Sequence, residues 1–203
     1  MENLIIYLLA YLIGGIPFGL ILTQIFAKTN IKNLGSKSIG ATNVLRVLKE
    51  NNPQLAKKLA ITTVVLDALK GIVPILIAKF LNYDDNILWT MAVLAVFGHC
   101  FSPYLKFEGG KGIATGAGVL ILFLPLEILV AIIAWFLTGK IFKISSLASL
   151  IALLVLIISS FIFHYDIPVI NTHAPIFIIA FIVVYKHIPN IVRLIGKKEC
   201  KVI

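Results

Sequence analysis

The chain has 203 residues, of which 60% are hydrophobic and only 13% are charged, and its formal net charge is +9. A soluble domain is closer to half apolar and a quarter charged, so the excess apolar side chains are expected to face lipid. This composition excludes an ordinary soluble nucleic-acid-binding protein, and the two cysteines, Cys100 and Cys200, predict no disulfide framework.

Apolar runs that could cross a bilayer, which takes roughly 20 residues, recur along the chain. The first covers residues 4–27 and contains Gly14, Gly15 and Pro17, which membrane helices tolerate where neighbours satisfy the freed backbone groups. A glycine-rich stretch begins at residue 106 and grades into an apolar run that ends near residue 124. The remaining spans are expected at residues 59–80, 87–101, 126–138, 147–163 and 174–185.

These runs predict an all-α fold, a polytopic membrane helix bundle that forms a single integral membrane domain over residues 1–203. About seven transmembrane helices are expected. The two runs on either side of Pro125 are each short for a span, so a single re-entrant hairpin is the alternative. Both arrangements leave the flanking loops on the same side.

The basic residues predict the orientation. All 18 lysines and arginines except Lys70 and Lys79 lie in segments 28–58, 102–111, 139–146 and 186–203, which alternate crossings place on one side. Because basic loops stay in the cytoplasm, the N-terminus is expected outside and the C-terminus inside. Asp67 and Lys70 lie three residues apart within the second span, and intramembrane charges are functional candidates by default. Mutual pairing that stabilises the bundle is the favoured interpretation.

Three polar clusters fall on the basic side. The first, residues 35–46, combines small residues, which let backbone amides approach a ligand, with the guanidinium of Arg46, which suits phosphate. An ordinary turn before a helix explains this cluster about equally well. In the second, Lys111 stands among Gly109, Gly110 and Gly112 before a helix, a combination of bare amides and a cation that favours an anion.

The third cluster, residues 187–199, places Asn190 and Arg193 on one face of a helix that is expected to begin near Pro189. Alone it would be interpreted as an interfacial basic helix. A weaker feature is Ser145-Ser146, which alone is typical of a helix cap.

Together the three clusters resemble the motifs of the bacterial acyl-phosphate-dependent glycerol-3-phosphate acyltransferases, integral membrane enzymes of phospholipid synthesis. The resemblance covers essentially the whole chain. It implies a seven-helix bundle in the bacterial plasma (inner) membrane with its active site facing the cytoplasm. It also implies transfer of a fatty acyl group from acyl phosphate to the 1-hydroxyl of glycerol 3-phosphate, which gives lysophosphatidic acid and phosphate.

The resemblance and the composition of the three clusters together give the expected site residues. Ser36, Arg46, Lys111 and His187 are expected to be catalytic, and because no Ser-His-Asp triad is evident, His187 or a phosphate oxygen is the hypothetical acceptor of the proton. The substrate-binding residues are expected to be Ser36, Ser38, Thr42, Asn43, Arg46, His99, Gly109, Gly110, Lys111, Gly112, Ser146, Asn190 and Arg193. Acyl phosphate, glycerol 3-phosphate and membrane lipid are the expected partners, without nucleic acid, cofactor or metal.

The sequence departs from the family pattern at Lys37 and Ser38, where a glycine and an asparagine are usual, and at Glu108, where a lysine is common. These changes fit a divergent second copy of the enzyme, and they leave an inactive lipid-binding protein as one alternative. A small anion transporter is the other alternative, but it would place polar groups near the membrane midplane rather than at one face.

Overall fold

The computed structural model describes residues 2–201, and in this part of the chain all regular structure is helical. The α-helices are α1 (Glu2–Gly14), α2 (Phe18–Ala27), α3 (Ala41–Leu48), α4 (Pro53–Phe80), α5 (Asp85–Cys100), α6 (Ile113–Leu120), α7 (Pro125–Phe142), α8 (Ser145–Phe163) and α9 (Ala174–Ile195). Two short 3-10 helices, η1 (Ile31–Asn33) and η2 (Pro103–Leu105), lie in the loops.

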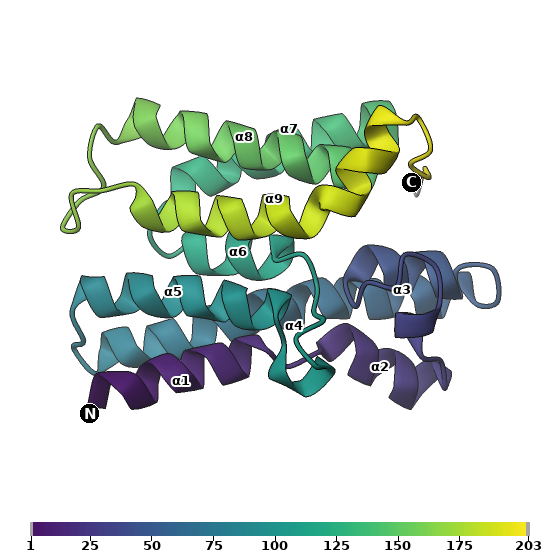
Figure 1. Cartoon of the computed structure of the whole chain (residues 1–203), viewed down its shortest axis with the longest axis horizontal. Helices are drawn as coiled ribbons and strands as arrows, with labels where there is room; N and C mark the ends of the chain where they lie inside the picture. Colours follow the sequence, from purple (N-terminus) through teal and green to yellow (C-terminus); the bar gives the residue numbers. More distant parts are fainter. Residues whose placement is uncertain (1, 202–203) are drawn as a thin grey trace.

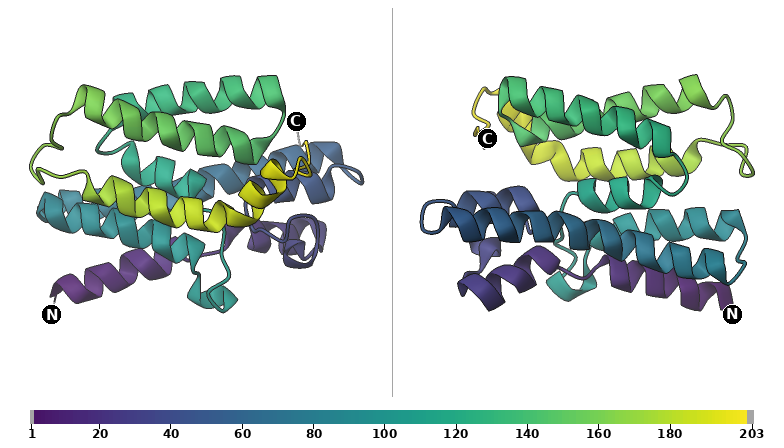
Figure 2. Two further views of the ribbon diagram at one scale, coloured as in Figure 1. Left: turned by 45° about the horizontal axis from the view of Figure 1, so that its top comes forward. Right: turned by 180° about the vertical axis from the view of Figure 1, so that it is seen from behind.

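The long helices run roughly parallel or antiparallel to one another in two layers. Figures 1 and 2 show α1, α4 and α5 side by side in one layer and α7 and α8 in the other. Helices α6 and α9 lie between the layers: α6 packs on α4, and α9 packs on both α5 and α8. Helices α2 and α3 cover the end of the bundle at which α9 ends, opposite the end at which α1 begins.

Six helical segments among the described residues are long and apolar enough to cross a membrane. They are Asn3–Ala27, Pro53–Phe80, Asp85–Leu105, Pro125–Phe142, Ser145–Phe163 and Ala174–Ile195. The run predicted at residues 106–124 is instead a loop followed by the eight-residue helix α6. That helix is about 12 Å long, too short to cross a hydrocarbon layer of roughly 30 Å. The all-α membrane bundle is confirmed, but seven full-length transmembrane helices are not.

Two helix boundaries differ from the sequence-based expectation for local reasons. Helix α4 begins at Pro53, six residues before the predicted span, because the Asn52 side chain accepts a hydrogen bond from the Leu55 amide and proline suits the first turn. Helix α9 does not begin near Pro189 but runs through it from Ala174 to Ile195. It changes direction toward its C-terminal end, where Pro189 can donate no backbone hydrogen bond (Figure 1).

Glycines allow close approach of α5 to α1 and of α6 to α4. A Cβ atom on Gly98 of α5 would lie 2.1 Å from the Tyr11 carbonyl oxygen of α1. A Cβ atom on Gly118 of α6 would lie 2.6 Å from the Ala68 carbonyl oxygen of α4. Such contacts are the usual means of helix association in lipid, where there is no hydrophobic driving force between helices. They hold α6 against α4 and thereby place the loop before α6 inside the bundle.

Candidate active site

A cavity of about 530 Å³ lies between the two layers and reaches the basic end of the bundle. Its polar wall combines residues from all three sequence clusters, from α4, from the end of α5 and from the start of α8. These residues are Ser36, Ser38, Thr42, Asn43, Arg46, Asp67, His99, Lys111, Ser145, Ser146, Ser149, His187, Asn190 and Glu199. The rest of the wall is almost wholly apolar, and it includes Val64, Ile72, Ile121, Ile128, Ile132 and Trp135 of α4, α6 and α7.

Asn43 shapes the first loop rather than facing the cavity with free polar groups. Its side-chain nitrogen donates to the carbonyl oxygens of Ile31, Leu34 and Ser38 at 3.1, 3.1 and 2.8 Å. Its side-chain oxygen accepts a hydrogen bond from the Ser36 amide at 2.8 Å, and the residue is only 1% exposed. Asn43 was expected to bind substrate, but both polar atoms of its side chain already make hydrogen bonds within the loop. Its role is therefore structural.

Replacing Asn43 with alanine is expected to lower the free energy of unfolding by about 3 kcal/mol, because several buried loop groups lose their partner. Denaturant titration in detergent micelles measures this change. Asn33→Ala is the matched control, since Asn33 is exposed in the same segment. Equal stability of the two variants would contradict the role assigned to Asn43.

The departure from the family pattern at Lys37 is accommodated by the backbone. Lys37 has φ of 59°, in the left-handed region that glycine adopts without cost and that costs other residues roughly 1–2 kcal/mol. Its side chain is exposed and does not line the cavity, whereas Ser36 and Ser38 on either side of it do. The loop therefore keeps a glycine-like turn without a glycine.

The second loop is built differently from the sequence-based expectation. The amides of Gly109 and Gly110 are not free for an anion, because they donate to the carbonyl oxygens of Cys100 and His99 at 3.1 and 2.9 Å. A Cβ atom on Gly110 would lie 2.0 Å from His99 Nε2. These glycines therefore permit close packing on the end of α5, and only Gly112 and Lys111 of this loop line the cavity.

Lys111 is a partly buried cation of the site. Burial lowers the pKa of its ammonium group to about 8; Glu199 opposes this shift, while Arg193 and Arg46 add to it. Arg46 reaches the same cavity from the last turn of α3. The cavity thus holds one cation from helix α3 and one from the loop before α6, an arrangement that suits phosphate groups.

Glu199 was not among the predicted site residues, although it lies in the third cluster. Its carboxylate accepts hydrogen bonds from Ser146 Oγ at 2.9 Å, from Asn190 Nδ2 at 2.6 Å and from Arg193 Nε at 2.5 Å. These donors hold the pKa of the Glu199 carboxyl below its ordinary value despite burial. Arg193 therefore touches Glu199 and does not line the cavity. Ser146 lines the cavity as predicted for a substrate-binding residue, but its side chain does not cap α8: the N-cap position is Ile144, and the Ser146 hydroxyl donates to Glu199.

His187 is fixed in one tautomer. Its Nδ1 lies 2.8 Å from the Val183 carbonyl oxygen, which can only accept a hydrogen bond, so Nδ1 carries the proton. Its other nitrogen, Nε2, is then an acceptor in the neutral ring. Thr42 reaches across the cavity to α8, with its hydroxyl 3.0 Å from that of Ser145.

Glu108 lies away from the cations of the cavity. It forms an ion pair with Lys32 at 3.2 Å, rather than with Lys106 or Lys111, and its side chain is 78% exposed. It does not line the cavity. The negative charge at this unusual position therefore does not occupy the proposed anion site.

The chain is similar to known proteins over nearly its full length. A family model described as glycerol-3-phosphate acyltransferase matches residues 4–197. Proteins named glycerol-3-phosphate acyltransferase from Campylobacter lari and Campylobacter jejuni subsp. doylei are 83% and 71% identical to it, each over 100% of both chains.

Two solved structures of PlsY (YgiH), an integral membrane glycerol 3-phosphate acyltransferase, have the same fold. The glycerol 3-phosphate form is 32% identical with a TM-score of 0.87, covering 99% of this chain and 96% of that one. The lysophosphatidic acid form is 31% identical with a TM-score of 0.82, covering 99% and 95%. The chain therefore belongs to the glycerol-3-phosphate acyltransferase family of integral membrane proteins.

Proposed function

We propose that this protein transfers a fatty acyl group from acyl phosphate to the 1-hydroxyl of glycerol 3-phosphate. Lysophosphatidic acid and inorganic phosphate are the products. The observation that carries the proposal is one cavity whose polar end holds Arg46 and Lys111 and whose other walls are apolar. A phosphate-bearing acyl donor has the same two parts, a charged group and a hydrocarbon chain.

The reaction needs little covalent help from the protein, because the acyl group of the donor is already activated. The 1-hydroxyl oxygen attacks the acyl carbon, an ester bond forms, and the bond between that carbon and the phosphate oxygen breaks. Arg46 and Lys111 hold the two phosphate groups close together and stabilise the charge that develops on the leaving phosphate. Ser36 and Ser38 add short hydrogen-bonding groups at the same end of the cavity.

The proton of the attacking hydroxyl passes to His187 Nε2 or to an oxygen of the leaving phosphate. His187 is favoured because the Val183 carbonyl oxygen holds the proton on Nδ1 and leaves Nε2 as an acceptor. His187→Ala is expected to lower kcat about 100-fold, in the range of general-base contributions. Steady-state turnover with thermal unfolding as a folding check tests this, and near-full turnover would exclude His187 as the base.

The orientation proposed is N-terminus outside and C-terminus inside, in the plasma (inner) membrane of a bacterium, with the cavity open toward the cytoplasm. It is supported by the basic segments, which join helices at the end of the bundle where α9 ends. The segment after Lys111, which begins at Gly112 and contains α6, supplies the seventh crossing. Irregular backbone at membrane depth is tolerated where it lines a cavity, as Gly112 does here.

The direct experiment gives the purified protein, in detergent, palmitoyl phosphate and labelled glycerol 3-phosphate. Labelled lysophosphatidic acid is the expected product, and palmitoyl-CoA in place of palmitoyl phosphate should give none. If no product formed while an active relative assayed in parallel gave product, the proposed acyltransferase activity would be contradicted. The alternatives of an anion transporter and an inactive lipid-binding protein are not favoured, because the similar proteins named above are acyltransferases.

A further inference from the structure

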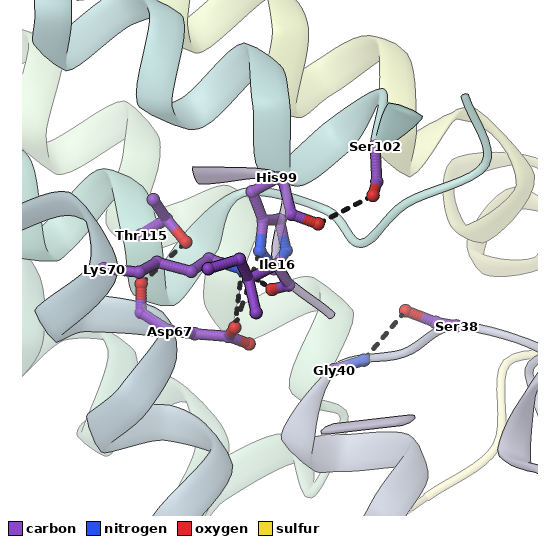
Figure 3. A network of polar contacts seen from close by, with 9 residues as sticks. Ile16, Ser38, Gly40, Asp67, Lys70, His99, Ser102 and Thr115 are labelled. Atoms are coloured by element: carbon purple, nitrogen blue, oxygen red, sulfur yellow. Dashed lines mark hydrogen bonds and ion pairs between the residues drawn. The ribbon is translucent and has the colours of Figure 1, made fainter. Parts of the chain in front are cut away.

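Asp67, Lys70 and His99 form a buried polar network to which the reaction assigns no step (Figure 3). Lys70 Nζ lies 2.8 Å from Asp67 Oδ1, which confirms the predicted pairing, and His99 Nδ1 lies 3.8 Å from the same oxygen. The three residues are only 3–4% exposed. Charges inside a membrane are costly, and a buried pair is weak evidence for stability. The contacts of this network with nearby backbone groups suggest a role other than stabilising the fold.

Lys70 holds the break between α1 and α2. Its ammonium group donates to the Ile16 carbonyl oxygen at 2.8 Å, and Ser102 Oγ donates to the neighbouring Gly15 carbonyl oxygen at 2.6 Å. These carbonyl groups lie where the helix is interrupted before Pro17, so they lack the usual helical donors. The side chains of α4 and of the segment after α5 therefore fix the direction in which α2 starts.

The start of α2 in turn supports the loop of residues 35–40, which precedes α3 and carries Ser36 and Ser38. A Cβ atom on Gly19, the second residue of α2, would lie only 2.0 Å from the Ile39 carbonyl oxygen. Ile39 stands between Ser38 and the residues that begin α3, the helix that carries Arg46. A shift of the α1–α2 break would therefore move this loop as well.

Backbone carbonyl groups of His99 and Asp67 accept hydrogen bonds on both sides of Lys111, and the Asp67 carboxylate reaches this loop through the His99 ring, whose Nδ1 lies 3.8 Å from it. Before Lys111, Gly110 donates to the His99 carbonyl oxygen at 2.9 Å and packs against the imidazole ring. After Lys111, Thr115 Oγ1 donates to the Asp67 backbone carbonyl oxygen at 2.8 Å. Thr115, four residues after Lys111, is thus attached to the same turn of α4 whose Lys70 anchors Ile16 at the α1–α2 break (Figure 3).

We propose that Asp67, Lys70 and His99 are positioning residues that set the spacing between the loop before α3 and the loop that carries Lys111. They act on the reaction through Arg46 and Lys111 and form no bond to the reacting atoms. This inference rests on the proposed function of the cavity. It predicts that a change at the membrane-buried pair alters the environment of Lys111, which lies in a different loop.

The test removes both charges together, as Asp67→Asn/Lys70→Met. Lys70→Met alone would leave an unpaired buried carboxylate and is expected to fold poorly, whereas the double variant is expected to unfold at a temperature near that of the parent. Its kcat/KM is expected to fall about 100-fold, the effect of a misplacement of about 1 Å. Thr115→Val, which removes a single tether, is expected to lower kcat/KM roughly fivefold.

The second measurement reads Lys111 directly, by mass spectrometry of its labelling with an amine-reactive reagent as a function of pH. The parent protein should show a midpoint at about 8, the lowered pKa of Lys111. The double variant should show a higher midpoint, although the charges that face Lys111, Glu199, Arg193 and Arg46, are unchanged. Lys79→Met, an exposed lysine elsewhere on α4, is the control and should change neither kcat/KM nor the midpoint.

Parent-like kcat/KM in the double variant would overturn the proposal, and so would a fall in kcat/KM with the Lys111 midpoint unchanged. If the parent and the Lys79→Met control both failed to acylate glycerol 3-phosphate, the proposed function would fail instead. The labelling midpoints would still decide whether the buried pair positions Lys111.

Discussion

Lys111→Ala is expected to lower kcat/KM for glycerol 3-phosphate acylation about 1000-fold. This is the effect expected when an enzyme loses one positioned group that stabilises negative charge developing in the transition state. Lys111 lines the cavity from a loop that is anchored on both sides, so little rearrangement of the loop can replace its ammonium group. Initial rates at low substrate concentration measure the effect. A loss smaller than tenfold would show that Lys111 does not contact phosphate in the transition state.

The same residue predicts a pH dependence. Because burial lowers the pKa of Lys111 to about 8, the charged form dominates below pH 8 and is lost as the pH rises further. The kcat/KM of the parent protein should therefore fall above pH 8, since this ratio reports the ionisation of the free enzyme. Lys111→Arg keeps its charge, so its profile should remain level through this range. An unchanged fall in Lys111→Arg would assign the titration to another group.

Arg46→Ala is expected to reduce kcat/KM by about 1000-fold for a related reason. Arg46 approaches the cavity from the last turn of α3, whereas Lys111 comes from the loop before α6, so neither cation can readily take the place of the other. Arg46→Lys should retain part of the activity, because it keeps the charge but loses the planar fork that binds two oxygen atoms.

The control for Arg46 is Lys49→Ala, which removes an exposed basic residue at the end of the same helix. It should leave kcat/KM unchanged, because Lys49 does not line the cavity. If Lys49→Ala were as damaging as Arg46→Ala, the effect would come from the overall positive charge of this end rather than from a specific phosphate contact.

The chemistry of the site could be predicted further than its geometry. The glycines beside Lys111 pointed to a loop that lines the cavity, but the amides of Gly109 and Gly110 are paired with the end of α5. Asn43 belonged to the right cluster, yet its amide is used within the loop. Glu199 was not predicted as a site residue. Its position in the third cluster was the available signal, but a negatively charged carboxylate is not expected in a site that binds anions.

The sequence by itself determined the membrane class, the all-helical architecture and the grouping of basic and polar residues into three clusters. Hydropathy and charge are properties of short segments, so they can be read without knowing how those segments pack. The short helix α6 was beyond this reasoning, because its ends depend on how the glycine-rich loop before it packs against α5.

Only the tertiary structure decided which polar groups are available to a substrate. Donors and acceptors of the site meet across long stretches of chain, as Lys70 meets Ile16 and Ser146 meets Glu199. A buried polar group must find a partner, and its choice among many is set by helix packing rather than by its neighbours in sequence. That packing leaves Arg46 and Lys111 facing the cavity while Asn43, Gly109 and Gly110 support the loops around them.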